Sequence, residues 1–587
     1  MKQNYFSQFS NLLRQLSLAT IVFTSIQASA QTISWIKEAG DNNRFTWAQG
    51  VSIDHHHNEI ISGFQNGNTH FGSTILPFYG NFDAYLAKYD SSGILLWVND
   101  IGGTDDDKAY RTVIDDSDNI YIVGGFVSNH LRFSSTDSMA ITSAGNQNFF
   151  LAKYDKNGNF LWSRNGGKAT PASYACYAKA VTIDPSGNVI IGGYYSASML
   201  IAGTTTTLPG TSGTVGVFVI KYAPNGTLIW ADNVLSIANC AINAIACDNA
   251  GNIFVTGKND DYMFTPADTI VKTNPGDHMF LFKYNSSGVL QWADTLGKML
   301  WTGSTDNTIT SGNDLAVDNL GNIYVAGNWL DTEYLVYDTV LSMYVPFYRQ
   351  YGFLAKYSNS GAQTWMQKFG GDNILYQGSI EESDQANGVA LDANGYPYVV
   401  GDFVSNTTFG GLSMTLPTFG TGFIGKFDPA TGNAIWIKTG GGLNGNQSLN
   451  ITIDQNGGDI ATTGVFQNFV NFDAITVNST STVMTYQDIY LTRHINPVTS
   501  GALSIAPINN IPYTIYPNPA AAYINIDLPD GVYHKVLITN LRGQTVLTTD
   551  TNNPSLQIDI QSLKPGNYTI SVVDQHNVMV SSKLVKL

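Results

Sequence analysis

The sequence predicts an all-β protein, a seven-bladed β-propeller followed by a small β-sandwich. One unit returns through most of the chain, first as Leu86-Ala-Lys-Tyr-Asp-Ser-Ser-Gly-Ile-Leu-Leu-Trp97. A second unit, such as Asp184-Pro-Ser-Gly-Asn188, precedes each copy, and its marker aspartates are Asp54, Asp115, Asp184, Asp248, Asp318, Asp392 and Asp454. The markers recur on average about every 67 residues, and a long fixed period is typical of solenoids and propellers.

Each repeat contains four short runs rich in Val, Ile, Tyr and Phe, which are typical of strands. In one copy these runs are 178–183, 188–192, 218–222 and 227–230. Tight Asp-to-Gly turns join the first run to the second and the third to the fourth. Four strands in each unit, repeated radially, predict propeller blades.

A tryptophan closes the fourth strand of six copies, namely Trp97, Trp162, Trp230, Trp292, Trp365 and Trp436. The seventh copy, Leu491-Thr-Arg-His494, has no such tryptophan. The N-terminal segment Ile33–Gly40 contains Trp35 and resembles a fourth strand. We therefore expect this segment to complete the last blade and close a ring of seven, within residues 31–495.

The composition and the N-terminus indicate an exported protein. The net charge is −16, and charged residues make up 13% of the chain, against about 25% in an average protein. This acidic balance argues against a nucleic-acid or anionic-membrane partner. Residues 1–30 have the charges, the short apolar run and the Ala28-Ser-Ala30 site of a cleavable signal peptide. The apolar run is too short for a transmembrane helix, and we expect no transmembrane segment.

Three cysteines leave at least one unpaired. Cys176 and Cys240 each stand eight residues before a marker aspartate, so they occupy equivalent places in adjacent blades. A Cys176–Cys240 disulfide and a pair of free thiols both remain open. Cys247 lies on a first strand, where we expect a small buried apolar residue.

After a polar linker, residues 496–512, residues 513–587 read as a small β-sandwich of short strands and turns. Three ordered motifs stand in it, Tyr516-Pro-Asn-Pro519, Val536–Gly543 and Leu563–Ile570, before the terminal Lys583–Lys586. Together they resemble the type A C-terminal sorting domain of type IX secretion. The sorting positions carried by this resemblance are Tyr516, Pro517, Asn518, Pro519, Gly543, Gly566, Lys583 and Lys586.

That resemblance implies export from a Bacteroidota-type bacterium across its outer membrane. The type IX machinery and its sortase would act on residues 513–587, leaving the protein on the cell surface or released. The earlier repeats similarly resemble the SBBP-type bacterial β-propeller repeat, which implies an architecture and no assigned chemistry. Asp428–Trp436 is similar to the tryptophan-docking repeat of quinoprotein dehydrogenases, although the other copies are one residue shorter. We interpret that likeness as shared blade packing.

A binding surface is expected on the face opposite the tight turns, because the longer, variable connections gather there. The candidate ligand-binding residues are Trp301, Trp329, Tyr334, Tyr344 and Tyr262. Such rings stack on sugar faces or anchor protein partners. The alternative is that they pack within their own loops.

No metal, cofactor or catalytic residue is expected. Asp105–Asp107 and the group Glu381, Glu382 and Asp384 could bind Ca²⁺, but no Ca²⁺-loop pattern is present, which favours a solvated charge run. His55–His57 occupies a tight turn, where consecutive side chains point in different directions and do not share one ion. The marker aspartates stand at turn starts, where Asp bonds its own backbone. No hydrolase or nucleotide-binding motif appears.

These features predict an exported, non-catalytic recognition or scaffold module that binds a glycan or a protein. The alternatives are an extracellular carbohydrate-active enzyme that uses the variable face or the central funnel, and a quinoprotein-like oxidoreductase. An enzyme should carry at least two carboxylates that the repeat does not explain, or a bound cofactor.

Overall fold

The computed structural model divides into two compact units, Met1–Asn496 and Pro497–Leu587. The expected signal peptide and linker lie outside the described residues. The structure describes residues 32–495 and 514–587 apart from 42–43, 143–146, 169–174, 211–213, 237–238, 261–262, 265–268, 271–277, 297–308, 339–342, 371–383, 405–406, 415–420, 441–443, 455–457, 473–474, 480–486, 528–532, 541–544, 551–554 and 575–578.

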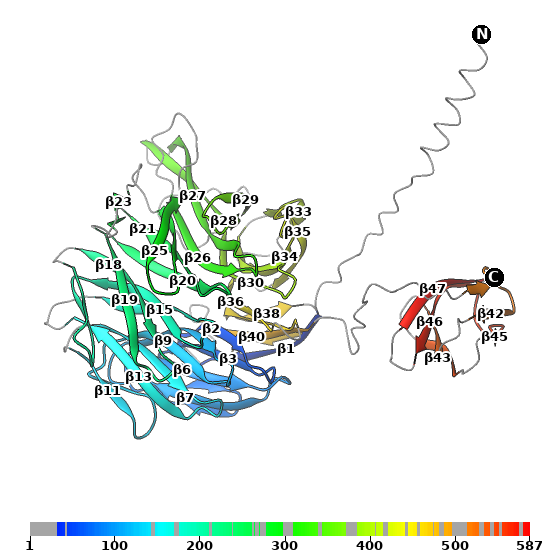
Figure 1. The fold of residues 1–587 in the computed structure, drawn as a ribbon, viewed down its shortest axis with the longest axis horizontal. Helices are drawn as coiled ribbons and strands as arrows, with labels where there is room; N and C mark the ends of the chain where they lie inside the picture. Colours follow the sequence, from blue (N-terminus) through cyan, green and yellow to red (C-terminus); the bar gives the residue numbers. More distant parts are fainter. Residues whose placement is uncertain are drawn as a thin grey trace, which may run out of the picture. The chain divides into compact units, whose positions relative to one another are not determined.

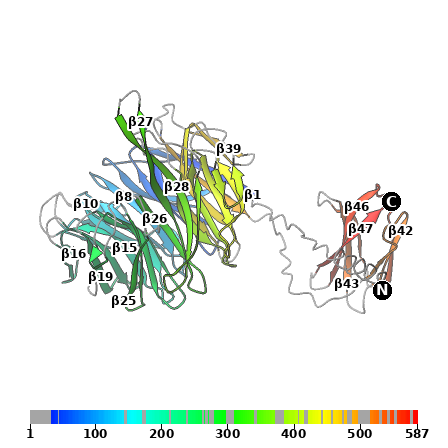
Figure 2. The same ribbon diagram turned by 90° about the horizontal axis from the view of Figure 1, so that it is seen from above.

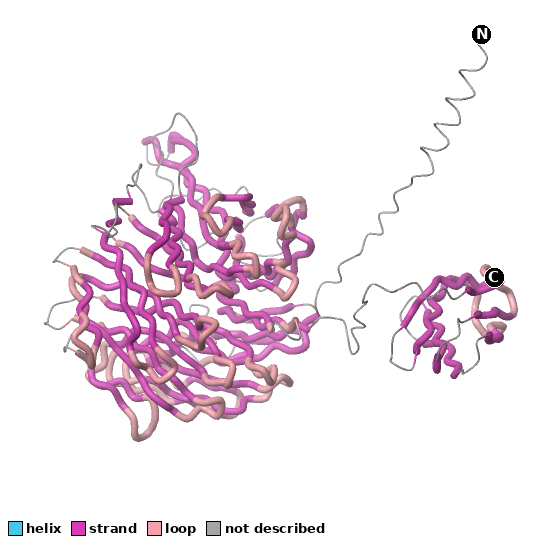
Figure 3. The backbone as a smooth tube through the Cα atoms, in the orientation of Figure 1, coloured by secondary structure: helices cyan, strands magenta, loops and turns pink. Residues whose placement is uncertain are grey.

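Every regular element in the described residues is a β-strand (Figure 3). An all-β fold, as predicted, is therefore confirmed. Among these same residues no helix has the length and apolarity to cross a membrane.

The described strands of the first unit form seven main sheets in chain order, numbered here from sheet 1 to sheet 7 (Figure 1). Sheet 1 contains β2 (Thr46–Ile53), β3 (Glu59–Gln65), β6 (Asp83–Tyr89) and β7 (Leu95–Ile101). Sheet 2 contains β8 (Asp107–Ile114), β9 (Ile120–Phe126), β12 (Asn148–Tyr154) and β13 (Phe160–Gly167). Sheet 3 contains β14 (Cys176–Ile183), β15 (Val189–Ser196), β18 (Val215–Tyr222) and β19 (Leu228–Ser236). Sheet 4 contains β20 (Cys240–Cys247), β21 (Ile253–Asn259), β24 (His278–Tyr284) and β25 (Leu290–Leu296).

The remaining sheets repeat this antiparallel order. Sheet 5 contains β26 (Ile309–Val317), β27 (Ile323–Asp338), β28 (Met343–Tyr357) and β29 (Gln363–Gly370), and its second and third strands extend beyond their neighbours (Figure 2). Sheet 6 contains β30 (Gln385–Leu391), β31 (Pro397–Phe403), β34 (Thr421–Phe427) and β35 (Ala434–Gly440). Sheet 7 contains β36 (Asn444–Ile453), β37 (Ile460–Gln467), β40 (Asp488–Ile495) and β1 (Thr32–Ala39).

Sheet 7 combines the two ends of this unit. The N-terminal strand β1 pairs antiparallel with β40, from Thr32 opposite Ile495 to Ala39 opposite Ile489. The first strands of neighbouring sheets contact one another in succession, and β36 of sheet 7 contacts β2 of sheet 1. A buried apolar cluster joins these two sheets and includes Trp35, Val51 and Leu491.

The repeated lysines and marker aspartates form the contacts between neighbouring sheets. Lys88 Nζ lies 2.7 Å from Asp54 Oδ2 in its own sheet and donates to the Lys156 carbonyl in the tight turn of sheet 2, at 3.0 Å. Lys221 repeats both contacts, with Asp184 Oδ2 and the Ser286 carbonyl. The marker aspartates therefore hold turns and lysines in place, which accounts for their periodicity.

The repeated tryptophans dock onto the next sheet in the same way. Trp162 Nε1 donates to the Pro224 carbonyl at 3.2 Å, and Trp365 Nε1 donates to the Pro429 carbonyl at 3.2 Å. Trp35 on β1 donates to the Ser91 carbonyl of sheet 1 at 3.1 Å. The N-terminal tryptophan thus does for sheet 7 what the internal tryptophans do for their own sheets.

Several connections between second and third strands fold into short hairpins that reach the preceding sheet. The pairs β16–β17, β22–β23 and β32–β33 extend sheets 2, 3 and 5 by pairing with their outermost strands. Their bounds are Met199–Ile201, Thr207–Leu208, Met263–Phe264, Thr269–Ile270, Thr407–Phe409 and Leu412–Met414. Three further hairpins are β4 (Thr69–Phe71) with β5 (Thr74–Leu76), β10 (His130–Arg132) with β11 (Ser138–Ala140), and β38 (Phe469–Phe472) with β39 (Ile475–Asn478). These variable connections are therefore partly structural.

The second unit is a two-sheet sandwich. Its sheets have the orders β41-β42-β45 and β44-β43-β46-β47, around a core that includes Ile526, Ile538 and Leu584. The strands are β41 (Thr514–Tyr516), β42 (Tyr523–Asp527), β43 (Tyr533–Asn540), β44 (Thr545–Asp550), β45 (Ser555–Asp559), β46 (Gly566–Asp574) and β47 (Met579–Lys586). Asn518 Oδ1 accepts a bond from the Val585 amide at 2.8 Å, which anchors the Tyr-Pro-Asn-Pro segment beside β47.

Candidate functional site

Of the predicted ligand-binding aromatics, the structure describes the side chain of Trp329. Trp329 on β27 is 4% exposed and packs in a core cluster, with Lys368 Nζ 3.9 Å from its ring centroid. Its expected exposure to a ligand is therefore wrong, and the loop-packing alternative holds for this residue. Trp301 and Tyr262 lie outside the described residues, and Tyr334 and Tyr344 lie on the long strands β27 and β28.

The three cysteines do not form the disulfide that the sequence left open. Cys176, Cys240 and Cys247 are free, so the Cys176–Cys240 disulfide is not formed, and Cys176 Sγ lies 3.3 Å from Met199 Sδ instead. Burial raises the pKa of each thiol.

The acidic clusters also differ from the prediction. Asp107 is fully buried and accepts a bond from the Ser128 hydroxyl, which contradicts a solvated charge run at Asp105–Asp107. Glu381 and Glu382 lie outside the described residues.

The three consecutive histidines connect neighbouring tight turns. His55 Nδ1 lies 2.8 Å from Asp118 Oδ1 and His56 Nδ1 lies 3.0 Å from Asp118 Oδ2, both in sheet 2. His57 Nδ1 points the other way, 2.9 Å from Asp454 Oδ2 in sheet 7. Asp118 raises the pKa of His55 through their hydrogen bond. The triplet therefore divides between two partners, as expected for consecutive residues.

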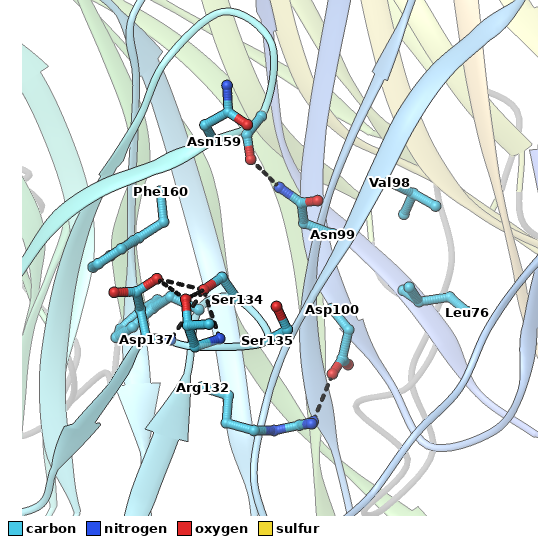
Figure 4. A pocket seen from close by; sticks show the side chains of 13 residues that line it. Leu76, Val98, Asn99, Asp100, Arg132, Ser134, Ser135, Asp137, Asn159 and Phe160 are labelled. Atoms are coloured by element: carbon cyan, nitrogen blue, oxygen red, sulfur yellow. Dashed lines mark hydrogen bonds and ion pairs between the residues drawn. The ribbon is translucent and has the colours of Figure 1, made fainter.

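A cleft of about 600 Å³ opens between sheets 1 and 2 (Figure 4). Its walls are the outer strand β7, the loop after β10 and the turn before β13. Arg132 Nη2 lies 2.8 Å from Asp100 Oδ2, and Asn99 Nδ2 donates to the Gly158 carbonyl at 2.7 Å. On the opposite wall Asp137 accepts bonds from the hydroxyls of Ser134 and Thr136. The cleft is therefore mainly polar and carries two carboxylates.

Aromatic rings border this cleft. Phe133 and Phe160 stack with ring centroids 5.0 Å apart. Tyr79 lies beside Arg132, whose Cζ is 4.0 Å from the ring centroid, and Tyr79 remains 55% exposed. An exposed ring next to polar side chains is an arrangement that suits sugar rings.

An equivalent cleft of about 680 Å³ lies between sheets 2 and 3. It uses the corresponding outer strand, hairpin and turn, but its lining residues include no carboxylate. Arg164 Nε donates to the Gly226 carbonyl at 2.7 Å, and Asn165 takes the place that Asp100 has in the first cleft. The two clefts share a geometry and differ in charge.

These cleft residues were missed by the sequence interpretation, although one signal was present. Three residues after each repeat tryptophan stand Asn165, Asn233, Thr295, Lys368 and Thr439, whereas sheet 1 has Asp100 and the N-terminal strand has Glu38. Five copies of the repeat have no carboxylate at this position, so Asp100 stands out when the copies are compared. Comparison of the copies position by position would have found it.

Buried carboxylates around the cleft have raised pKa values. Burial and the nearby Asp83 raise the pKa of Asp100 to about 7. Burial also raises the pKa of Asp107 to about 7, against the opposing bonds from Ser128. Asp137 differs, because Ser134 and Thr136 lower its pKa. Asp100 and Asp137, whose pKa values shift in opposite directions, therefore line the same cleft.

We expect stability to fall as the pH rises from 5 to 8. Carboxyls of the unfolded chain titrate near pH 4, so the folded state binds more protons between pH 4 and 7 at Asp100, Asp107 and Glu38. Carboxylates with lowered pKa values, such as Asp54, change the stability only below about pH 4. Thermal unfolding at pH 5 and pH 8 tests the sign, and Asp107→Asn should flatten the dependence. A melting temperature that rises toward pH 8 would contradict it.

Among the described residues, an ion pair joins the first strands of two distant sheets. Arg111 Nη1 of β8 lies 2.9 Å from Asp314 Oδ1 of β26, and Asp314 Oδ2 accepts the Val389 amide of sheet 6. Burial raises the pKa of Asp314, and Arg111 opposes that rise. Toward the tight turns, first strands of sheets 3 to 7 line a cavity of about 420 Å³.

Two segments of the chain match the models of known protein families. Residues 514–586 match the family model of the secretion system C-terminal sorting domain, and residues 296–328 match that of a β-propeller repeat. The chain carries a type IX sorting domain. It is therefore an exported protein of the cell surface or the extracellular space, and its repeats are β-propeller-like.

Individual relatives are distant. An uncharacterised WD repeat-containing protein of Acanthamoeba polyphaga mimivirus is 25% identical over 337 residues, which are 48% of this chain and 24% of that protein. The chain thus spans about a quarter of this relative's length. PorZ, a surface component of the type IX secretion system of Porphyromonas gingivalis, aligns over 94% of this chain and 100% of its own, at 10% identity and a TM-score of 0.16. The extracellular domain of BT4673 from B. thetaiotaomicron aligns over 94% and 99%, at 10% identity and a TM-score of 0.15. Both likenesses are too weak to assign a fold or a function.

Proposed function

We propose that the chain is a secreted or surface-attached recognition module built on a closed seven-bladed propeller, in which each numbered sheet is one blade. The pairing of β1 with β40, the contact of β36 with β2 and the Trp35–Ser91 bond support the closed ring. Residues 1–30 would be removed as a signal peptide in a Bacteroidota-type bacterium. The type IX sortase would then act on the sorting domain.

Recognition of a glycan, without catalysis, is the function that the geometry supports best. The observation that carries it is the pair of equivalent clefts between sheets 1 and 2 and between sheets 2 and 3. Both have a volume in the range of small-molecule sites, and the exposed ring of Tyr79 lies beside Arg132, which lines the first cleft. The repeated carboxylates, in contrast, are occupied in joining the sheets.

A glycan array with residues 31–587 tests this function. We expect retention of at least one glycan without cleavage, and weaker retention by Arg132→Ala or Tyr79→Ala, which remove the polar and aromatic edge of the first cleft. Lys156→Ala is the control, since Lys156 is exposed and the substitution keeps the backbone carbonyl that accepts the bond from Lys88. Retention that does not change in either cleft variant would remove the cleft from the proposal.

A carbohydrate-active enzyme is the second candidate. It is favoured by Asp100 and Asp137, two carboxylates in one cleft whose pKa values shift in opposite directions, as in an acid and nucleophile pair. Products from each retained glycan decide between the candidates. Cleavage that Asp100→Asn and Asp137→Asn abolish would establish the enzyme and exclude the non-catalytic module.

A further inference from the structure

The first strand of every sheet contains a β-bulge at the same place. The pairing of each first strand with its neighbour shifts by one residue there, in all seven sheets of the described residues. A bulge turns the side chain of its extra residue out of the regular alternation. The bulged residues are Gln49, Tyr110, Lys179, Asn243, Asn313, Asn387 and Leu449.

In sheets 4 to 6 the bulged residue is an asparagine that bonds to the next sheet. Asn243 Nδ2 donates to the Gly312 carbonyl at 2.9 Å, Asn313 Nδ2 to the Ala386 carbonyl at 3.0 Å, and Asn387 Nδ2 to the Ser448 carbonyl at 3.1 Å. In these three sheets the bulged residue therefore connects one first strand to the following one. Sheets 2 and 3 place a tyrosine and a lysine at this position instead.

The lysine of sheet 3 is surrounded by aromatic rings. Lys179 Nζ lies 5.7 Å from the ring centroid of Tyr110 and 5.8 Å from that of Tyr194. Tyr177 lies between them, with its centroid 5.9 Å from Tyr110 and 5.3 Å from Tyr194. All four side chains are partly exposed. Three tyrosines and one ammonium group thus form a single cluster, named here the lysine–tyrosine cluster.

The charged groups near this cluster include Lys258 and Asp106. Within the described part of the chain, no carboxylate lies in ion-pair range of Lys179. Burial and the neighbouring Lys258 lower the pKa of Lys179. Asp106 is close enough to affect Tyr110 and Tyr177, but it already lies 3.6 Å from Lys108 Nζ. Lys179 therefore presents an ammonium group that no described carboxylate neutralises.

We propose that the lysine–tyrosine cluster binds the anionic group of an acidic glycan, a carboxylate or a sulfate on a sugar ring. Lys179 would pair with the anion, and the tyrosines would contact the faces of the sugar rings. This inference rests on glycan recognition as the proposed function and names a second site for it, apart from the two clefts.

The test compares acidic and neutral oligosaccharides with residues 31–587. The probes are an oligogalacturonate, a sulfated galactan oligosaccharide that has no carboxylate, and a neutral galactan oligosaccharide, measured by calorimetry at low and at physiological ionic strength. We expect one acidic probe to bind and Lys179→Gln to weaken it by about tenfold or more, because a charge-assisted contact is lost. Lys156→Gln, the same change on an exposed turn, should leave the affinity within about twofold. Which acidic probe binds separates a carboxylate ligand from a sulfate ligand.

Several outcomes would overturn the inference. Equal losses in Lys179→Gln and Lys156→Gln would indicate non-specific attraction, and equal affinity for the neutral and acidic probes would exclude an anion site. Retention of neutral glycans with no binding of either acidic probe would reject this site while leaving the recognition function in place. If no glycan of any kind binds, both the acidic-glycan site and the proposed recognition function are rejected. Tyr194→Leu, which removes a ring of the cluster, provides a second variant, should Lys179→Gln fail to fold.

Discussion

Trp35→Ala is expected to lower the free energy of unfolding by about 3–5 kcal/mol, the usual cost of truncating a buried aromatic side chain. Trp35 is 9% exposed, belongs to the apolar cluster between sheets 7 and 1, and donates to the Ser91 carbonyl at 3.1 Å. Its ring also covers Gly93, where a Cβ atom would lie 2.9 Å from Trp35 Cδ2. Urea unfolding measures the loss, and hydrogen exchange should show faster opening of β1 from β40.

Trp35→Phe is the matched control. It keeps most of the buried ring and removes the indole N–H, so a loss of about 1 kcal/mol is expected. If Trp35→Ala cost no more than Trp35→Phe, the ring of Trp35 would not hold sheet 7 to sheet 1. The idea that the N-terminal strand completes the propeller would then lose its main support.

Arg493→Ala is expected to be similarly damaging, at about 3–5 kcal/mol, because it leaves a buried carboxylate without its partner. Arg493 on β40 pairs through Nη1 with Glu59 of sheet 1, and its Nη1 also donates to the His57 carbonyl. Glu59 is fully buried, and burial raises its pKa while Arg493 opposes that rise. Urea unfolding at pH 9.5, above the pKa of about 8 that Glu59 has beside Arg493, measures the loss.

The double variant Arg493→Ala/Glu59→Gln and the pH provide the controls. Glu59 has a pKa of about 8, and without Arg493 this pKa rises further, so Glu59 is neutral at pH 6 in both proteins and charged at pH 9.5 where Arg493 is present. The single variant should therefore lose less stability at pH 6 than at pH 9.5, and the double variant should recover much of the loss at pH 9.5. An equal loss at both pH values would mean that the buried charge of Glu59 is not the cause.

Much of the fold could be predicted because its determinants are local and repeated. Asp-to-Gly turns and runs such as 178–183 fix strands and pairing within a sheet, and the structure has β14 and β15 there, each slightly longer than predicted. The sorting domain was also predictable, since its strands are separated by clear turn residues. The hairpins that join the preceding sheet were not predicted, because their partners stand in another repeat.

The candidate site was harder to predict, because burial decides it. Trp329 was chosen as an exposed ring in a variable connection, yet it packs against Lys368, a residue 39 positions away in the sequence. Cys176 and Cys240 occupy equivalent positions, but equivalent positions in adjacent sheets need not be close, and both thiols are buried and free. Asp100 and Lys179 were overlooked because each resembles an ordinary member of a strand until the copies are compared.

The hairpins β16–β17, β22–β23 and β32–β33 have a consequence for solubility. An outermost strand with free backbone groups can pair with a strand of another molecule and start aggregation. In sheets 2, 3 and 5 the next repeat supplies a short strand that occupies part of this edge. These three repeats thereby shield part of the preceding sheet's edge from other molecules, which lowers the risk of aggregation for an exported protein.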